Sequence, residues 1–275
     1  MRRRISLGRS FSHAWVILLI LITVAPFAWL LLQSFKNNFD SIAVPPKFIF
    51  KPILDNYTSV IRDQGFLRAF LDSLIVGVGS VTLTLMIGVP FSYALTRFDF
   101  AGKKDMAFFI LSTRMLPAIV VIVPFIQIFH FLGISDSYPG MILAHVLVNL
   151  ALVVWVMRGF FQGIPIELDE AALIDGCTLW SAFRRVVLPL AAPGLASVAS
   201  LGFLFSWNEL LFAFTLTSFN VRTLPVFMTT QYVGYLAVDW GRLSAAGILA
   251  TLPIVLLVMA LQRNMASGLT LGAVK

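Results

Sequence analysis

The sequence has few charged side chains. Asp, Glu, Lys and Arg together make up 12% of its 275 residues, whereas soluble domains carry about 25%. Hydrophobic residues make up 59% and include 25 phenylalanines. This shortage of charge excludes an ordinary soluble domain and predicts an integral membrane protein with most of its mass in the bilayer. The net charge of +7 does not indicate a nucleic-acid surface, because the basic residues are scattered over short loops.

Cysteine and histidine are scarce as well. Cys177 is the only cysteine, so the chain can form no internal disulfide. The three histidines, His13, His130 and His145, do not have the spacing of metal ligands. We therefore expect no metal and no cofactor in this chain, and we interpret Cys177 as a small residue rather than a reactive thiol.

Two common catalytic motifs are missing. Gly102-Lys103-Lys104 lacks the earlier glycine and the Ser/Thr of a phosphate-binding loop, so the chain cannot hydrolyse ATP by that route. Gly133-Ile134-Ser135-Asp136-Ser137 fails the G-x-S-x-G pattern at its last position. An intramembrane hydrolase could use His145 with Ser112 or Ser206, but no motif marks these residues. We expect that the chain is not an enzyme.

Six hydrophobic runs are long enough to cross a bilayer core of about 30 Å, which needs roughly 20 residues in a helix. The lone G-x-G formed by Gly77 and Gly79 lies inside the second run and indicates close helix packing rather than nucleotide binding. We predict an all-α integral membrane fold of six transmembrane helices, with a segment 1–13, a membrane domain 14–263 and a tail 264–275. The predicted spans are approximately 14–32, 73–95, 107–131, 138–160, 190–216 and 243–261.

The distribution of Lys and Arg predicts how the chain is oriented. Twelve of them lie in the terminal segments, in the loop between the second and third spans, and in the loop between the fourth and fifth. The opposite side carries seven, of which five are spread along one long loop. Because short cytoplasmic loops are enriched in Lys and Arg, we predict a bacterial inner-membrane protein with both termini in the cytoplasm.

The cytoplasmic loop of about residues 161–190 contains an acidic segment with clear boundaries. Pro165 suits the start of a helix and Gly176 suits its left-handed end. A helix this short is marginal by itself, so we expect it to dock onto another surface. A helix lying on lipid headgroups is the other interpretation, but such helices are usually basic. The acids of the first turns, which the helix dipole favours, are Glu167, Asp169 and Glu170. The small apolar face is formed by Leu168, Ala171 and Ala172.

Polar side chains inside the predicted spans are costly in lipid and usually face a cavity or a partner. The opposite charges of Arg114 and Glu209 would allow an ion pair between the third and fifth spans. Two interpretations stay open: structural pairing between helices, or a polar translocation path for a hydroxyl-rich solute. The candidates for that path are Arg114, Gln127, Asn149, Asn208 and Glu209, with further hydrogen-bonding capacity at His145.

Several motifs together resemble one family. Glu170-Ala171-Ala172, Asp175-Gly176 and Leu188-Pro189 follow one another at the spacing of the EAA loop of ABC importer permeases. With Trp207-Asn208-Glu209 and the ending 268–275, the sequence resembles the carbohydrate-uptake permeases, and among them the maltose-transporter type, over nearly its whole length. The resemblance implies the type I ABC importer permease fold. It also implies a permease for a disaccharide or sugar alcohol in an ATP-driven, binding-protein-dependent importer.

The resemblance implies partners and site residues as well. A second permease subunit (MalF-like), an ATPase dimer (MalK-like) that binds ATP and Mg, and an external solute-binding protein would complete the importer. An ABC permease for an amino acid or phosphate ester, and a secondary transporter, stay open as alternatives. The residues implied to couple to the ATPase are Glu167, Leu168, Glu170, Ala171, Ala172, Asp175 and Gly176. Those implied to contact it from the tail are Gly268, Leu269 and Thr270.

Overall fold

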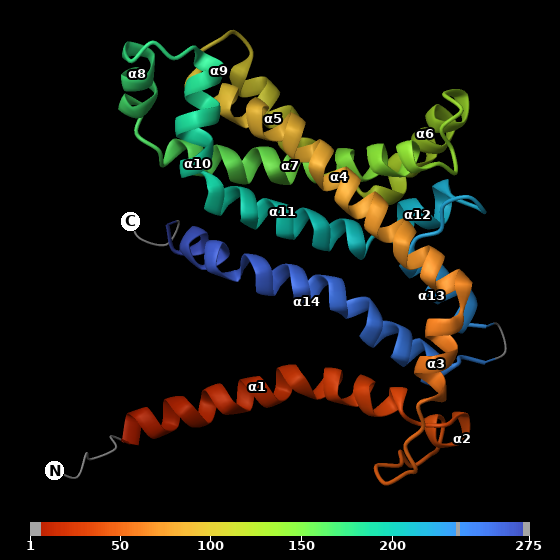
Figure 1. Cartoon of the computed structure of the whole chain (residues 1–275). Helices are drawn as coiled ribbons and strands as arrows, with labels where there is room; N and C mark the ends of the chain where they lie inside the picture. Colours follow the sequence, from red (N-terminus) through yellow and green to blue (C-terminus); the bar gives the residue numbers. More distant parts are fainter. Residues whose placement is uncertain (1–6, 235–236, 272–275) are drawn as a thin grey trace. The chain divides into compact units, whose positions relative to one another are not determined.

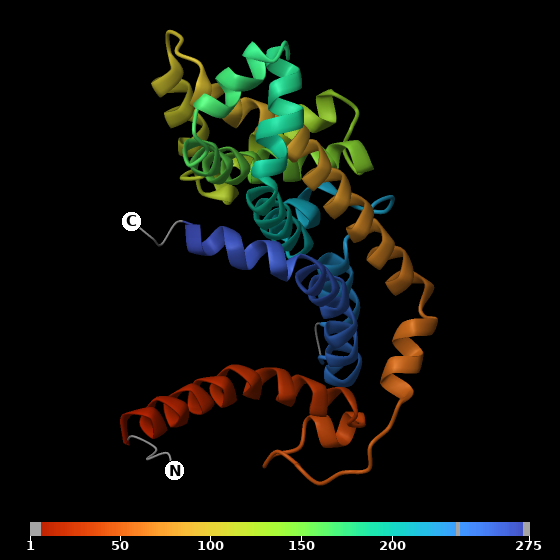
Figure 2. The ribbon, with the colours of Figure 1, turned by 60° about the vertical axis from the view of Figure 1, so that its left-hand side comes forward.

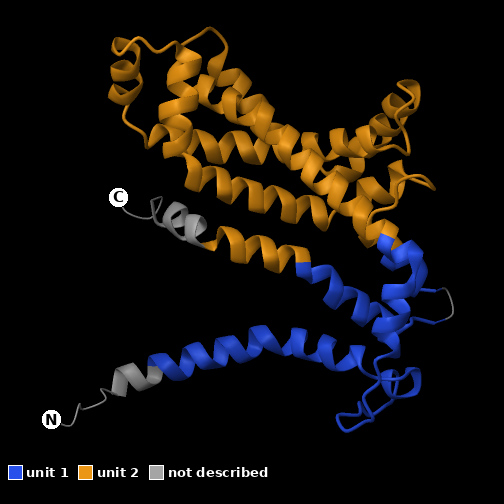
Figure 3. Ribbon diagram, viewed as in Figure 1, with its two compact units in different colours: residues 1–67, 228–252 blue, residues 68–227, 253–275 orange. Residues whose placement is uncertain are grey.

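The computed structural model describes residues 7–234 and 237–271, and side chains within 12–234 and 237–262. This part of the chain is helical, and apart from an isolated bridge between Val233 and Val238 it contains no strand. The chain divides into two compact units, residues 1–67 with 228–252 and residues 68–227 with 253–275 (Figure 3). The all-α membrane fold predicted from the sequence is confirmed.

In the first unit, hydrogen bonds around the end of the long first helix hold the neighbouring loop and short helices together. The Ser34 hydroxyl lies 2.7 Å from the Tyr57 hydroxyl, and the Asn56 amide donates to the carbonyls of Ser34 and Lys36. The Lys36 ammonium lies 4.4 Å from the centre of the Trp29 ring, where a cation is attracted to the ring face. The helices of this unit are α1 (Leu7–Ser34), α2 (Asn38–Ser41), α3 (Asp55–Arg62) and the first part of α14 (Trp240–Leu271).

The second unit contains most of the membrane helices, with α7 among the most buried of them. In Figures 1 and 2, α7 and α11 lie side by side, and both contribute buried residues to the core. The helices are α4 (Gln64–Arg97), α5 (Lys103–Thr113), α6 (Ala118–Phe131), α7 (Tyr138–Gln162), α8 (Glu167–Ile174), α9 (Leu179–Ala182), the π-helical turn η1 (Phe183–Val187), α10 (Leu188–Leu190), α11 (Ala192–Trp207), α12 (Leu211–Leu216) and α13 (Leu224–Tyr232). Helix α4 starts, and helix α13 ends, in residues of the first unit.

Glycines allow these helices to approach closely. A Cβ at Gly79 would lie 2.8 Å from Ile142 of α7, and one at Gly77 would lie 3.0 Å from Phe203 of α11. Both distances are shorter than a normal carbon contact. The G-x-G of the second span therefore serves helix packing, as expected from the sequence.

Four of the described helices are long and apolar enough to span a membrane, and two bent helix pairs raise the number to six if each pair is one span. The four continuous helices agree with the first, second, fourth and sixth predicted spans. They are Ser12–Ser34, Gln64–Arg97, Tyr138–Gln162 and Trp240–Gln262. The bent pairs are α5 with α6, at 98°, and Leu179–Leu190 with α11, at 76°.

The third and fifth predicted spans differ from the structure, because neither is one straight helix. The third breaks after α5, and α6 begins only after Pro117, whose ring disfavours helical backbone in the residue before it. The fifth bends near Ala191, and α11 ends at Trp207, so that α12 is a separate short helix. Both interruptions leave backbone polar groups at membrane depth, which proteins tolerate where the groups face protein or a cavity.

Candidate coupling helix and membrane cavity

Helix α8 occupies the centre of the acidic segment and ends as the sequence predicted. Gly176 adopts a left-handed backbone with φ of 86°. Its N–H donates to the Leu173 carbonyl, and the N–H of Cys177 donates to the Ala172 carbonyl. This pair of hydrogen bonds is the Schellman motif, which satisfies carbonyls left free at a helix end. The start differs slightly, because Ile166 rather than Pro165 is the residue flanking the first turn.

A buried ion pair attaches α8 to the end of α4. The Asp169 carboxylate lies 2.9 Å from Nε of Arg97, and each of the two side chains is only 9% exposed. The Tyr93 hydroxyl donates to the same carboxylate at 2.5 Å, and the Arg97 guanidinium also donates to the Ile164 carbonyl at 2.9 Å. An eight-residue helix cannot persist alone, so these contacts are what position it.

Aromatic packing surrounds this anchor. The Tyr93 ring lies 4.6 Å from the ring of Phe183 in η1 and 5.6 Å from that of Phe161 in α7, measured between centroids. Helix α8 packs against η1 and α9, and Ala172 is buried in that contact. The anchor therefore joins α8 to several membrane helices of the second unit at once.

The remaining face of α8 is open. Of the seven residues predicted to couple to an ATPase, Ala172 alone is buried within the chain, where it packs inward. Large apolar side chains absent from that prediction are exposed on α8 and the adjoining α9, including Ile174 at 85% exposed and Trp180 at 61% exposed. The exposed predicted residues are Glu167, Leu168, Glu170, Ala171, Asp175 and Gly176. The open face thus combines acidic groups with an apolar border.

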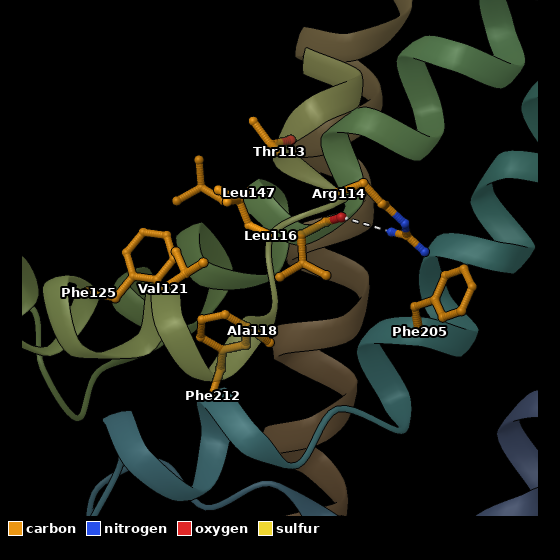
Figure 4. Close-up of a pocket in the computed structure, with 10 residues that line it drawn as sticks. Thr113, Arg114, Leu116, Ala118, Val121, Phe125, Leu147, Phe205 and Phe212 are labelled. Atoms are coloured by element: carbon orange, nitrogen blue, oxygen red, sulfur yellow. Dashed lines mark hydrogen bonds between the residues drawn. The ribbon is translucent and has the colours of Figure 1, made fainter. Parts of the chain in front are cut away.

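The second feature is a cavity of about 400 Å³ at the break between α5 and α6 (Figure 4). Phe125, Phe205 and Phe212 form much of its wall, and Arg114 and Thr113 supply its polar groups. None of the residues described as lining it is acidic. The cavity is thus apolar with one positive charge.

Arg114 does not pair with Glu209, so the ion pair suggested by the sequence is wrong. The bend after α5 places the guanidinium near α7 and α11, where it donates to the Val148 carbonyl at 3.0 Å and lies 4.8 Å from the centre of the Phe205 ring. Glu209 instead accepts the N–H groups of Phe212 and Ala213 at the start of α12. A carboxylate is favoured there by the unpaired N–H groups of the helix end.

Glu209 also belongs to a buried polar cluster. Its carboxylate lies 3.6 Å from Nε2 of His145, whose Nδ1 makes a short hydrogen bond with the Ser206 hydroxyl. Ser206 in turn lies 3.1 Å from the Ser80 hydroxyl of α4. Serine, histidine and carboxylate follow one another as in a hydrolase triad. However, Ser206 is buried and forms a hydrogen bond with Ser80 of α4, so the cluster connects α4, α7 and α11 structurally.

The other residues predicted for a path lie apart from the cavity. Gln127 is exposed on α6. Asn149 is buried on α7 and donates to the Gly202 carbonyl at 3.4 Å. Asn208 is exposed and its amide donates to the Leu204 carbonyl, which closes the end of α11. Of the five predicted residues, the structure places Arg114 alone at this cavity.

A carboxylate that the sequence analysis missed organises the loop after α12. Asp136, with a φ of 51°, accepts four backbone N–H groups from residues 218–221 at 2.9 to 3.3 Å. Partial burial tends to raise the pKa of this carboxyl, but the four N–H donors outweigh it and lower the pKa below its ordinary value. Asp72 similarly accepts from the Tyr138 hydroxyl and the Arg222 N–H. No local pattern around Asp136 or Asp72 marks these partners, which lie far away in sequence.

The predicted tail contacts fall at the edge of the described chain. Gly268, Leu269 and Thr270 belong to the last turns of α14, but their side chains lie outside the described residues. Residues 272–275 of the same motif also lie outside them.

Comparison with known proteins assigns the chain to a family. Residues 85–270 match the model of the binding-protein-dependent transport system inner membrane component. The trehalose permease SugB of Mycobacterium tuberculosis is 33% identical, over 98% of this chain and 100% of its own length. The diacetylchitobiose permease DasC of Streptomyces coelicolor is 32% identical over 99% of each chain.

A further relative and two solved structures support the same family and fold. The sulfoquinovosyl glycerol permease SmoH of Agrobacterium fabrum is 32% identical over 98% of this chain and 94% of its own. A bacterial transporter that imports the acidic polysaccharide alginate contains a chain with a TM-score of 0.78 at 22% identity, covering 94% of this chain and 98% of that one. The MetNI methionine transporter gives a TM-score of 0.61 at 19% identity, over 74% and 95%. The fold is thus that of ABC importer permeases, and the chain belongs to the family of integral inner-membrane components of binding-protein-dependent transport systems.

Proposed function

We propose that this chain is one permease subunit of an ATP-driven importer for a sugar or polyol, and that the open face of α8 couples it to an ATPase. The observation that carries the proposal is the construction of α8. A helix too short to be stable alone is fixed to α4 by the buried Arg97–Asp169 pair, while Glu170 and its neighbours stay exposed. A rigid support with an open acidic and apolar face is suited to transmit movement from a bound partner.

The comparisons support a carbohydrate as the solute. Relatives about one third identical are named for trehalose, diacetylchitobiose and sulfoquinovosyl glycerol, which are all glycosides. The likeness to a methionine transporter is below 25% identity and concerns the fold alone. An amino acid or phosphate ester is therefore not favoured as the solute of this chain.

The proposal includes the rest of the importer. A second permease subunit would complete the translocation path, an external binding protein would deliver the solute, and two ATPase subunits would bind ATP and Mg. This chain would then perform no catalysis. Both termini and α8 would face the cytoplasm, in agreement with the excess of Lys and Arg on that side.

Charge reversal at Glu170 tests the coupling. Glu170→Lys should leave the protein inserted and assembled with the other permease, but solute-stimulated ATP hydrolysis and import should be lost, because the new charge would repel a basic groove on the ATPase. Asp99→Lys is the matched control, since Asp99 is fully exposed in the loop after α4 and outside α8. Normal import by Glu170→Lys would overturn the proposal.

A further inference from the structure

The cavity between α5, α6 and α11 has a composition that the coupling mechanism does not explain. Arg114 is exposed towards it, and among the described residues no carboxylate lies within ion-pair distance of the guanidinium. An arginine at membrane depth is costly and is usually retained where it meets a partner or a pathway. Something outside the described chain is therefore needed to satisfy this charge.

The guanidinium has unused hydrogen-bonding capacity. One of its five N–H donors is bound by the Val148 carbonyl at 3.0 Å, and the group lies over the Phe205 ring (Figure 4). The Phe205 ring fixes its orientation without taking a donor. The other donors have no hydrogen-bond acceptor among the described residues, and Arg114 lines the cavity.

The break in the helix adds further donors of the same sign. Helix α6 begins at Ala118, which lines the cavity. The Val120 N–H donates to the Pro117 carbonyl at 2.9 Å, so the N–H groups of Ala118 and Ile119 are the ones without a partner within the helix. The positive end of the α6 dipole lies at this same end of the helix. In secondary transporters, broken helices of this kind commonly form the solute sites. Arg114 and the start of α6 together offer donors and no acidic acceptor.

The aromatic walls of the cavity indicate the apolar part of the ligand. Phe125, Phe205 and Phe212 present ring faces and edges, and the volume of about 400 Å³ lies within the range of small-molecule sites. A sugar ring combines these two requirements, because its C–H face packs on an aromatic ring while its oxygens accept hydrogen bonds. A cationic group would be repelled by Arg114.

We infer that this cavity is a solute subsite contributed by this chain itself. It takes an oxygen-rich unit, a neutral or anionic sugar ring, with Arg114 donating to its oxygens and the aromatic wall packing on its C–H face; it rejects a cationic sugar. The inference rests on the proposed function, since it assumes a carbohydrate solute. It adds that this subunit, and not its partner permease alone, contacts that solute.

Thiol modification in the assembled importer tests the inference without knowledge of the natural solute. In a Cys177→Ser background, Ala118→Cys places a thiol in the cavity, and Val123→Cys places a control thiol on an exposed part of α6 outside it. The probes are a sulfonate-bearing and a trimethylammonium-bearing methanethiosulfonate. With each rate divided by the rate of the same reagent with a free thiol in solution, we expect the sulfonate reagent to modify Ala118→Cys about tenfold faster, as electrostatic attraction into a positive site allows.

Three comparisons decide the result. Arg114→Gln should remove most of the preference for the sulfonate reagent at Ala118→Cys, whereas Val123→Cys should show no preference. Trehalose, maltose or glucuronate should slow modification of Ala118→Cys, and glucosamine should not. A thiol at residue 118 that stays unreactive in every nucleotide state would show that lipid or a partner side chain fills the cavity, and would overturn the inference.

Two other outcomes would also overturn it: a charge preference that survives Arg114→Gln, or a reactive thiol that none of the three sugars protects. ATP-driven uptake of labelled trehalose and maltose, and its dependence on Glu170, is measured separately in the same vesicles. Loss of the charge preference or of sugar protection at residue 118 with uptake intact would refute the subsite alone, whereas absence of ATP-driven uptake would count against the proposed function.

Discussion

Replacing Asp169 by alanine should release α8 from the membrane helices while leaving those helices folded. Arg97 and Asp169 are both 9% exposed, and Tyr93 donates to the same carboxylate. Removing one partner of such a buried pair costs about 3–5 kcal/mol, because the other charge stays buried without compensation. Even about 3 kcal/mol changes the ratio of docked to undocked α8 roughly 150-fold. A helix of eight residues has little stability of its own to offset this loss.

Two measurements on the purified importer follow the effect. Hydrogen exchange should become faster at the amides of α8, and solute-stimulated ATP hydrolysis should fall in proportion to the fraction of α8 that is undocked. In the double variant Arg97→Ala with Asp169→Ala the loss should be smaller than the sum of the two single losses, since no charge is left unpaired. The exposed pair of Asp99 with Lys103 is the control, and Asp99→Ala should change neither quantity. Unchanged exchange in Asp169→Ala would refute the anchor, as would strictly additive losses.

The remaining predictions concern the loop after α12, the orientation and the path. Asp136→Asn should accelerate amide exchange at residues 218–221. Because the native carboxyl has a lowered pKa, the protection of these amides in the wild type should be fully present above the unfolded pKa of about 3.9. After correction for intrinsic exchange, it should be lost only as the pH falls through the lower folded pKa. A loss of protection already near neutral pH would contradict this. Ser135→Cys should react with an impermeant thiol reagent added outside, and Cys177 should not; the reverse pattern would invert the orientation. Asn208→Ala removes the hydrogen bond to the Leu204 carbonyl and should lower thermal stability slightly with import retained. Abolished import in a stably assembled complex would instead support the predicted role of Asn208 in the translocation path.

Local chemistry made the position and ends of α8 predictable. Proline before the helix and Gly176 after it are short-range signals, and the structure forms the left-handed end that the glycine permits. The anchor was not predictable in this way. Asp169 is one of three neighbouring acids, and only the fold shows that it turns inward to Arg97, which belongs to another helix.

The membrane interior shows the same limit. Hydropathy located every apolar run, but it could not show that the third run bends by 98° around Pro117. That bend decides where Arg114 points, so the ion pair with Glu209 that was predicted from charge alone does not form. Glu209 meets the N–H groups of α12, a helix start that lay inside a predicted continuous span. Sequence patterns specify the presence of helices better than the interruptions that create sites.

A photoreactive benzophenone amino acid at position 170, in membranes containing the whole importer, shows whether the open face of α8 contacts an ATPase. If it does, position 170 should cross-link to the ATPase subunit. A control position at Phe219, which is 87% exposed in the loop after α12, should give no such cross-link. Absence of the cross-link at position 170, or an equal yield at position 219, would show that α8 does not couple this chain to the ATPase.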